Sequence, residues 1–232
     1  MFNSLQSIQN IFSYDSLPSS HAISIPVNLP DEINQIFDDI SYKKGGSVIR
    51  MMANFLGINT FNKGVTNYLH ANAYSNADQD DLWGFLTAAG QEDGSLTDLS
   101  VKEIMDTWTV QMGYPVVDIK RNTDGTVSAS QNRFLLTPIT SNETDNNPYT
   151  WWVPLSFTTP SGGFAVTAPQ AWLNPANADA DTEIDVSALP SLDTEPLIAN
   201  VQQTGFYRVN YDLDNWGRIR DALKSDHEKI NR

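Results

Sequence analysis

The sequence predicts an α+β fold in which helices come first, short strands follow, and one more helix closes the chain. Up to about Gly113, apolar residues recur at the three- and four-residue spacing of a helix face. After Pro115 they alternate with other residues at the two-residue period of a strand, between turn signals. With 232 residues, 40% of them hydrophobic, the chain is long enough to bury a sizeable core.

Several helices are expected in the first half, packed antiparallel on short connections. Pro30 is placed to open the first helix, and Gly57 and Gly90 are placed to close two later ones. Gly113 and Pro115 stop the last. The apolar stripes, in chain order, are Ile33, Ile36, Phe37 and Ile40; Val48, Met51, Met52, Phe55 and Leu56; Phe61, Val65, Tyr68 and Leu69; "DQDDLWGFLTAAG" at 78–90; and Val101, Ile104, Met105 and Trp108.

Short strands are expected after Pro115, and their regular spacing favours a small β-sandwich. Residues 115–130, "PVVDIKRNTDGTVSAS", predict two strands around an Asp124–Gly125 turn. "WWVPLSF" at 151–157 and "FYRVNY" at 206–211 alternate as strands do. Pro154 suits an edge strand or a bulge. A final helix has Trp216, Ile219 and Leu223 on one face.

Composition excludes several classes of function. The formal net charge of −14 argues against nucleic acid as a partner, because a phosphate backbone would repel the chain. The absence of cysteine excludes disulfides and thiolate metal sites. No run approaches the roughly 20 apolar residues of a membrane-spanning segment, and no signal peptide is expected at the start. Asn142, in the triplet Asn142-Glu143-Thr144, is a candidate glycosylation site.

Local spacing does not define a metal site. The chain has three histidines, His21, His70 and His227. The helical zinc motif H-E-x-x-H is approached only at 227–231, where Asn231 stands in place of the second histidine. His70 is interpreted as a partly exposed structural residue. We therefore assign no metal ligand and no cofactor-binding residue in this chain.

Tyr42 stands at a break between two apolar stripes and is followed by Lys43, Lys44, Gly45 and Gly46. A tyrosine hydroxyl is uncharged at neutral pH and donates one hydrogen bond. At a rigid helix junction it could stabilise a developing oxyanion, a role worth about 10²–10³ in rate when one donor is lost. On the pattern alone, packing in the core or at a helix cap is the more frequent role.

The order of several longer motifs changes that assessment. "SSHAISIPV", "FDDISYKKGGSVIRMM", "DLW", "VKEIMDTWTVQMGYPVV", "NVQQTGFYRVNYDLDNW" and "HEKINR" follow one another along nearly the whole chain. Together they resemble the zinc aminopeptidases of the aminopeptidase N family, which are gluzincin metallopeptidases. The resemblance implies three parts: residues 1–113, the helical C-terminal portion of a thermolysin-like catalytic domain; residues 114–209, a β-sandwich; and residues 210–232, the first helix of a C-terminal helical domain.

The resemblance also implies a function for Tyr42. In the family, the tyrosine of the "ISYxKG" block hydrogen-bonds the tetrahedral oxyanion beside the zinc during cleavage of the amino-terminal residue from a peptide. Tyr42 holds that place in "ISYKKG", and Gly45–Gly46 are expected to permit close packing behind it. The implied partners are peptide substrates.

The sequence departs from the family pattern in what it lacks. The zinc motif H-E-x-x-H, the second zinc-binding glutamate and the G-x-M-E-N segment are absent. The chain is therefore expected to be a fragment, inactive alone, with apolar helix faces exposed. The competing hypothesis is a truncated, catalytically silent relative that acts as a protein-binding module. A plasma-membrane or extracellular location is a family-level expectation, and cytosolic relatives exist.

Overall fold

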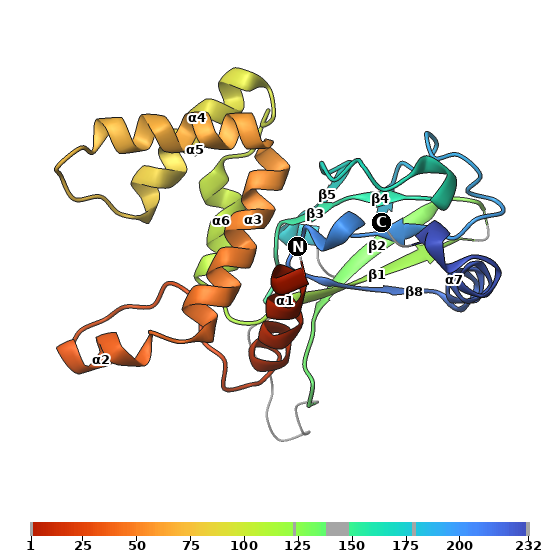
Figure 1. The fold of residues 1–232 in the computed structure, drawn as a ribbon, viewed down its shortest axis with the longest axis horizontal. Helices are drawn as coiled ribbons and strands as arrows, with labels where there is room; N and C mark the ends of the chain where they lie inside the picture. The colour runs from red at the N-terminus through yellow and green to blue at the C-terminus, as the bar shows by residue number, and fades with distance from the viewer. Residues whose placement is uncertain (1, 123, 138–148, 178–179, 231–232) are drawn as a thin grey trace.

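A computed structural model describes residues 2–122, 124–137, 149–177 and 180–230. Helices dominate the first half, and short strands followed by helix α7 make up the regular structure of the second, which confirms the α+β fold class (Figure 1). The helices are α1 Phe2–Asp15, α2 Pro30–Gln35, α3 Gly45–Leu56, α4 Ile58–Ala71, α5 Gln79–Asp93, α6 Val101–Thr109 and α7 Leu213–Ser225. A π-helical turn, η1, spans Ile40–Lys44, and 3-10 turns are η2 Pro160–Gly162, η3 Pro175–Asn177, η4 Val201–Gln203 and η5 His227–Ile230.

Helix α3 forms the centre of the helical half, and the sequence predicted it well. All five residues of its apolar stripe are buried, and it ends at Gly57, whose φ of +82° favours glycine. Helix α6 lies beside α3 (Figure 1), and its predicted stripe is also buried. Ser100 caps α6 by accepting a hydrogen bond from the backbone N–H of Glu103. Capping and periodicity therefore agree on these two elements.

Two predictions in this half are wrong. Helix α5 does not end at Gly90 but continues to Asp93, with Gly94 at φ +75° as its C-terminal cap. Gly90 is buried inside the helix, where a Cβ would lie 2.9 Å from Leu96 Cδ1, so it is small for packing rather than for a turn. The second wrong prediction is the single helical stripe from Ile33 to Ile40. Helix α2 ends at Gln35, and its Ile33 is 46% exposed.

The β-rich half holds three small sheets within the described residues. The strands are β1 Pro115–Arg121, β2 Val127–Arg133, β3 Val153–Leu155, β4 Phe157–Thr158, β5 Ala171–Leu173, β6 Thr182–Ile184, β7 Ile198–Ala199 and β8 Arg208–Tyr211. One sheet has the order β6-β2-β1-β8, and the pairs β3-β5 and β4-β7 form the others. The predicted antiparallel hairpin of β1 and β2 is confirmed, with Gly125 at φ +89° in its turn.

Pairing in these sheets adds two features that periodicity did not indicate. Strand β8 runs parallel to β1, with Val209 opposite Val117, and extends past Val209, the end predicted for the sandwich. Strand β3 is buried throughout, including Pro154, so its alternation does not mark an exposed face. The prediction of an edge strand for Pro154 is confirmed, because β3 pairs with β5 alone in a two-stranded sheet.

The two halves share one buried core. The rings of Trp108 in α6 and Trp151 before β3 lie 6.0 Å apart, and both residues are fully buried. Trp108 Nε1 donates a hydrogen bond of 2.9 Å to the backbone oxygen of Trp152. The helical region is therefore packed directly on the β-rich region through aromatic side chains.

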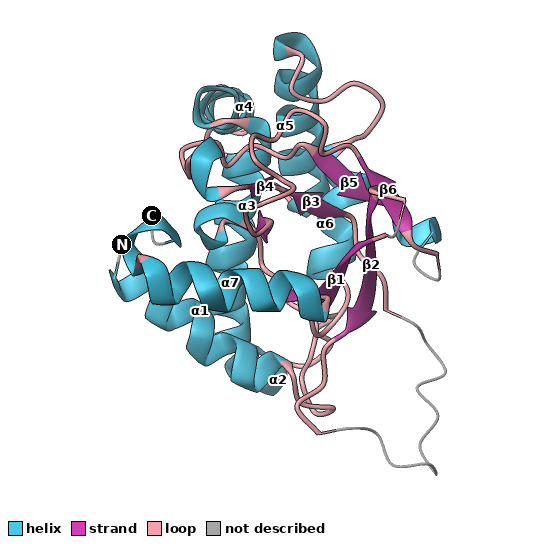
Figure 2. Ribbon diagram, turned by 90° about the vertical axis from the view of Figure 1, so that its right-hand side faces the viewer, coloured by secondary structure: helices cyan, strands magenta, loops and turns pink. Residues whose placement is uncertain are grey.

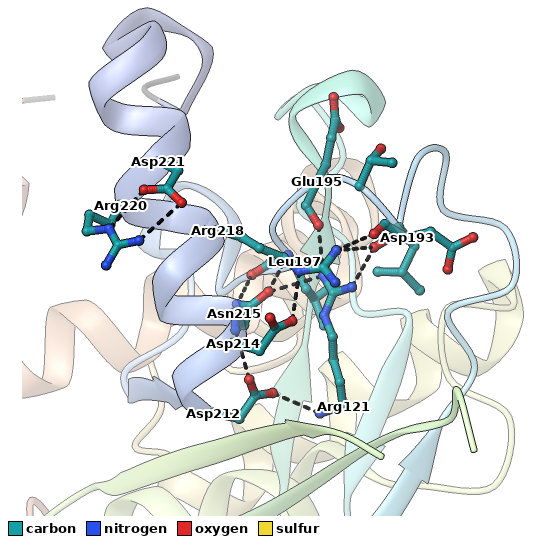
Figure 3. Close-up of polar contacts among 12 residues, drawn as sticks. Arg121, Asp193, Glu195, Leu197, Asp212, Asp214, Asn215, Arg218, Arg220 and Asp221 are labelled. Carbon is teal, nitrogen blue, oxygen red and sulfur yellow. Dashed lines mark hydrogen bonds and ion pairs between the residues drawn. The ribbon is translucent and has the colours of Figure 1, made fainter. Parts of the chain in front are cut away.

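Helix α7 lies beside the β-rich region (Figures 1 and 2), and a polar cluster around Arg121 holds it there (Figure 3). The Arg121 guanidinium donates to the backbone oxygen of Glu195 at 2.9 Å and to Asn215 Oδ1 at 3.1 Å. Asn215, buried in α7, also bonds both backbone groups of Leu197. The predicted apolar face of α7 is buried at Ile219 but largely open elsewhere, so the polar cluster supplies much of the attachment.

Candidate functional site

Tyr42 lies in the π-helical turn η1, between α2 and α3. Its side chain is 65% exposed, and its ring centroid is 6.1 Å from that of Phe37, which is equally exposed. The phenol is therefore open to solvent rather than enclosed by aliphatic side chains. Single π turns occur frequently at functional sites, because the wider turn redirects one side chain.

Backbone and side-chain hydrogen bonds define this turn. The N–H of Gly45 donates to the backbone oxygen of Ile40, the five-residue pattern of a π-helix. The N–H of Ser41 donates to Asp38 Oδ1 at 3.0 Å, and the N–H of Tyr42 donates to the Asp38 backbone oxygen at 3.2 Å. Asp38 therefore supports the turn with both its side chain and its main chain.

His21 also binds the Asp38 side chain, and the spacing of residues in the sequence did not predict this pair. His21 Nε2 lies 2.6 Å from Asp38 Oδ2, and Nδ1 lies 2.8 Å from the backbone oxygen of Ala22. Burial lowers the pKa of His21, but the bonds to Asp38 and Ala22 outweigh it, so the pKa is raised above its ordinary value. Burial raises the pKa of Asp38, but the bonds from Ser41 and His21 outweigh it, so that pKa is lowered.

A buried ion pair lies on the opposite side of the turn from Tyr42. Lys44 and Asp15 have fully buried side chains, and Lys44 Nζ lies 3.0 Å from Asp15 Oδ2. Neither the spacing of these residues nor the apolar stripes could predict the contact, because 29 positions separate them in the sequence. The only local indication was an unexpected lysine at a helix start.

The expectation of close packing behind Tyr42 at Gly45–Gly46 is wrong for the described residues. A Cβ added to either glycine would meet nothing within 4 Å. Both glycines have ordinary helical positions rather than positive φ values. Their small size is thus not required by any contact in this part of the chain.

Large apolar side chains are exposed on the segments flanking Tyr42, as predicted for this half. Leu29, Phe37 and Ile49 are between 49% and 65% exposed. Isolated exposed apolar residues are common, but several on neighbouring segments indicate a surface suited to contact with another molecule or segment.

The remaining sequence-based expectations concern metal ligands, His70, Asn142 and membrane-spanning segments. No group of three or more His, Cys, Asp or Glu side chains that could hold a metal ion occurs among the described residues. His70 is exposed, near the end of α4, more so than predicted. Asn142, the candidate glycosylation site, lies outside the described residues. No helix of the described part is long and apolar enough to cross a membrane.

Comparison with known proteins gives the class of this chain. Residues 1–108 match the family model described as the peptidase family M1 domain. That match contains α1 to α5, the Tyr42 turn and most of α6. Together with the relatives described next, it shows that the chain belongs to the peptidase M1 family.

Individual relatives extend the similarity through the β-rich half. Human aminopeptidase N is 36% identical over 231 residues, covering 97% of this chain and 22% of the relative. Aminopeptidase N of Canis lupus familiaris is 39% identical over 228 residues, covering 96% and 22%. The human thyrotropin-releasing hormone-degrading ectoenzyme is 34% identical over 229 residues, covering 96% and 21%. The chain thus spans about a fifth of the length of these curated relatives.

Proposed function

We propose that this chain is part of a zinc aminopeptidase and that Tyr42 stabilises the tetrahedral oxyanion formed when the amino-terminal residue is cleaved from a peptide. The observation that carries the proposal is the open position of the Tyr42 phenol on a π turn, in a chain of the M1 family. An oxyanion donor must reach the reacting atoms, so a phenol buried in the core would be incompatible with the role.

The chemistry supplied by this chain is one uncharged hydrogen-bond donor. The Tyr42 O–H would donate to the oxygen that gains negative charge as the carbonyl becomes tetrahedral. Because the bond strengthens as charge develops, it stabilises the transition state more than the bound substrate. The rigid turn holds the donor in place beforehand, so little reorganisation is needed during the reaction.

The M1 family is zinc-dependent in general, and the metal would polarise the substrate carbonyl and activate a water molecule. The described residues of this chain do not form a ligand set for zinc. We therefore propose no zinc ligand, general base or amine-binding group among the described residues.

Substrates and location follow from relatives only as expectations. Peptides are the proposed substrates. One relative is named an ectoenzyme, which supports an extracellular or plasma-membrane location for the protein that contains this chain.

Kinetics of an extended protein test the proposal. In a form that includes an upstream H-E-x-x-H segment, Tyr42→Phe should lower kcat about 10²–10³-fold with little change in KM, because only a transition-state bond is removed. Tyr74→Phe, the same change at a fully exposed tyrosine, is the matched control and should have no effect. Equal changes in kcat and KM, or a loss no larger than that of the control, would contradict the role of Tyr42.

The exposed apolar surface around Tyr42 also fits the competing hypothesis of a silent binding module. Zinc content and cleavage of an amino-acid anilide by the 232-residue chain separate the two, together with the extended protein. We expect neither zinc nor turnover in the chain alone, and turnover in the extended protein. An extended protein without an H-E-x-x-H segment and without activity would favour the binding module.

A further inference from the structure

The ammonium of Lys44 is surrounded by three oxygen atoms inside the protein, one in an ion pair and two in hydrogen bonds. Nζ lies 3.0 Å from Asp15 Oδ2, 2.9 Å from the backbone oxygen of Gly113 and 3.3 Å from that of Gln111. The ring of Phe206 adds a cation–π contact at 5.9 Å. Lys44 is therefore fixed in direction as well as buried, because two backbone acceptors and one carboxylate around the nitrogen define its position.

Asp15 adds Ser20 to the network and makes a second bond to Gly113. Its Oδ1 accepts hydrogen bonds from Ser20 Oγ at 2.6 Å and from the backbone N–H of Gly113 at 2.9 Å. The pair thus joins the end of α1, the turn η1 and the segment before β1, which are distant in sequence. Helix α1 packs against the Tyr42 turn, and the segment before β1 is bound to it through Lys44.

Stability alone is a poor explanation for such a pair. Two charges lose their hydration when buried, and well-packed apolar residues of similar volume are often equally or more stabilising. In keeping with this cost, burial lowers the pKa of Lys44, and Asp15 offsets the effect only in part. Unlike apolar packing, the directional contacts of the pair allow the turn only one position and one rotation.

The position and rotation of the turn determine where the Tyr42 phenol points. Lys44 follows Tyr42 by two positions, and Ile40 precedes it by two, so both lie on the opposite face of the turn. Ile40 is 5% exposed and Lys44 is fully buried, while Tyr42 between them is 65% exposed. If η1 rotated or slipped by one residue, Lys44 would lose its acceptors and the phenol would turn away from its present direction.

We propose that the buried Asp15–Lys44 pair is a positioning device for the Tyr42 hydroxyl. The inference rests on the proposed function of Tyr42, and it assigns Asp15 and Lys44 no contact with substrate. Their role is to fix the turn on which the hydroxyl is mounted.

The test removes both charges together. The single variant Lys44→Met leaves Asp15 buried without its partner and should lower the urea midpoint of unfolding strongly. The double variant Asp15→Leu, Lys44→Met should regain much of that loss. The control is Lys43→Met, the same change one position earlier, where the lysine pairs with Asp39 at the surface at 2.6 Å.

The decisive measurements report on the Tyr42 turn rather than on stability. In the 232-residue chain, hydrogen exchange of the amides of residues 41–45 should be at least about tenfold faster in the double variant than in the wild type. A fluorine label on the Tyr42 ring should give a broadened or divided NMR signal. Lys43→Met should leave both measurements unchanged. If the stable double variant keeps wild-type exchange and a single sharp Tyr42 signal, the proposal is wrong.

A milder variant covers the case in which the double variant does not fold. Ser20→Ala removes one hydrogen bond to Asp15 Oδ1 at a partly buried position, and it should raise exchange in residues 41–45 selectively. Unchanged exchange in this variant would likewise count against the proposal.

Kinetics of the extended protein separate this inference from the proposed function. We expect the double variant to lower kcat about tenfold with KM and zinc content unchanged, since a misplaced donor loses part of its transition-state bond. If Tyr42→Phe has no effect on kcat while the double variant loosens the turn, the proposed oxyanion role of Tyr42 is wrong. The proposal that the pair fixes the turn is then still supported. If Tyr42→Phe lowers kcat while the double variant changes neither exchange nor kcat, the positioning role fails alone.

Discussion

Substitution of Gly64 by alanine measures the tightness of the contact between α4 and α5. A Cβ at Gly64 would lie 2.7 Å from Leu86 Cδ2, 3.1 Å from Leu86 Cα and 3.3 Å from the backbone oxygen of Phe85. Two of these three atoms belong to the backbone of α5, and Leu86 is fully buried. A rotamer change cannot relieve such contacts, so the two helices would have to move apart.

The expected magnitude is a balance of two terms. Replacing glycine by alanine inside a helix stabilises by about 1 kcal/mol. Overpacking a close contact costs about 1–3 kcal/mol. Gly64→Ala should therefore lower the free energy of unfolding by about 0–2 kcal/mol. Gly84→Ala, within α5, meets nothing within 4 Å and should raise it by about 1 kcal/mol.

The difference between the two variants is the useful quantity, because the helix-propensity term cancels. Urea unfolding followed by far-UV circular dichroism, with equal m-values, should place Gly64→Ala about 1–3 kcal/mol below Gly84→Ala. If Gly64→Ala is as stabilising as Gly84→Ala, the close α4–α5 contact does not exist in solution and the reasoning is refuted.

Three further predictions concern the surroundings of Tyr42 and the turn that contacts its helix. Arg50→Met should destabilise by about 1.5–3 kcal/mol, because the guanidinium donates a 2.6 Å hydrogen bond to a backbone oxygen of the β-rich half; an unchanged urea midpoint would contradict this. The His21–Asp38 pair should stabilise most in the window between their two pKa values. The raised pKa of His21 makes its contribution complete below about pH 6.5 and lost as pH rises through the folded-state value. The lowered pKa of Asp38 makes its contribution complete above about pH 4 and lost as pH falls through the folded-state value. In urea unfolding at several pH values, His21→Gln should abolish the decrease in stability that accompanies the rise in pH through the folded-state pKa of His21. A decrease that persists in this variant would show that other groups cause it. Asn200 and Gln202 both have positive φ, at 56° and 57°. Gln202→Gly should change the stability by less than about 1 kcal/mol, because the relief of strain offsets the loss of the exposed hydrogen bond from Gln202 Nε2 to the backbone oxygen of Phe164. Asn200→Gly should destabilise, because its side chain makes three buried hydrogen bonds. Equal effects in thermal unfolding would contradict this assignment.

Local sequence determined the elements whose ends and faces depend on neighbouring residues. The stripe from Val48 to Leu56 predicted α3, because a helix brings residues three and four apart onto one face. Asp124–Gly125 predicted the β1–β2 turn, because glycine tolerates the positive φ that the turn needs. The position of Tyr42 at a helix junction was also visible in the sequence, but its chemical role came from resemblance to a family.

Only the tertiary structure decided the features that depend on distant partners. The sequence suggested that Gly90 ends a helix, but it could not distinguish a helix end from a position where glycine is needed for packing against Leu96. It marked Phe37 as apolar but could not show that the side chain stays 65% exposed. The Asp15–Lys44 pair joins residues 29 positions apart, and its formation depends on how α1 packs beside the Tyr42 turn. The physical reason is the same in each case: a local pattern specifies which side chains prefer burial, whereas the fold of the whole chain determines which partners are within reach.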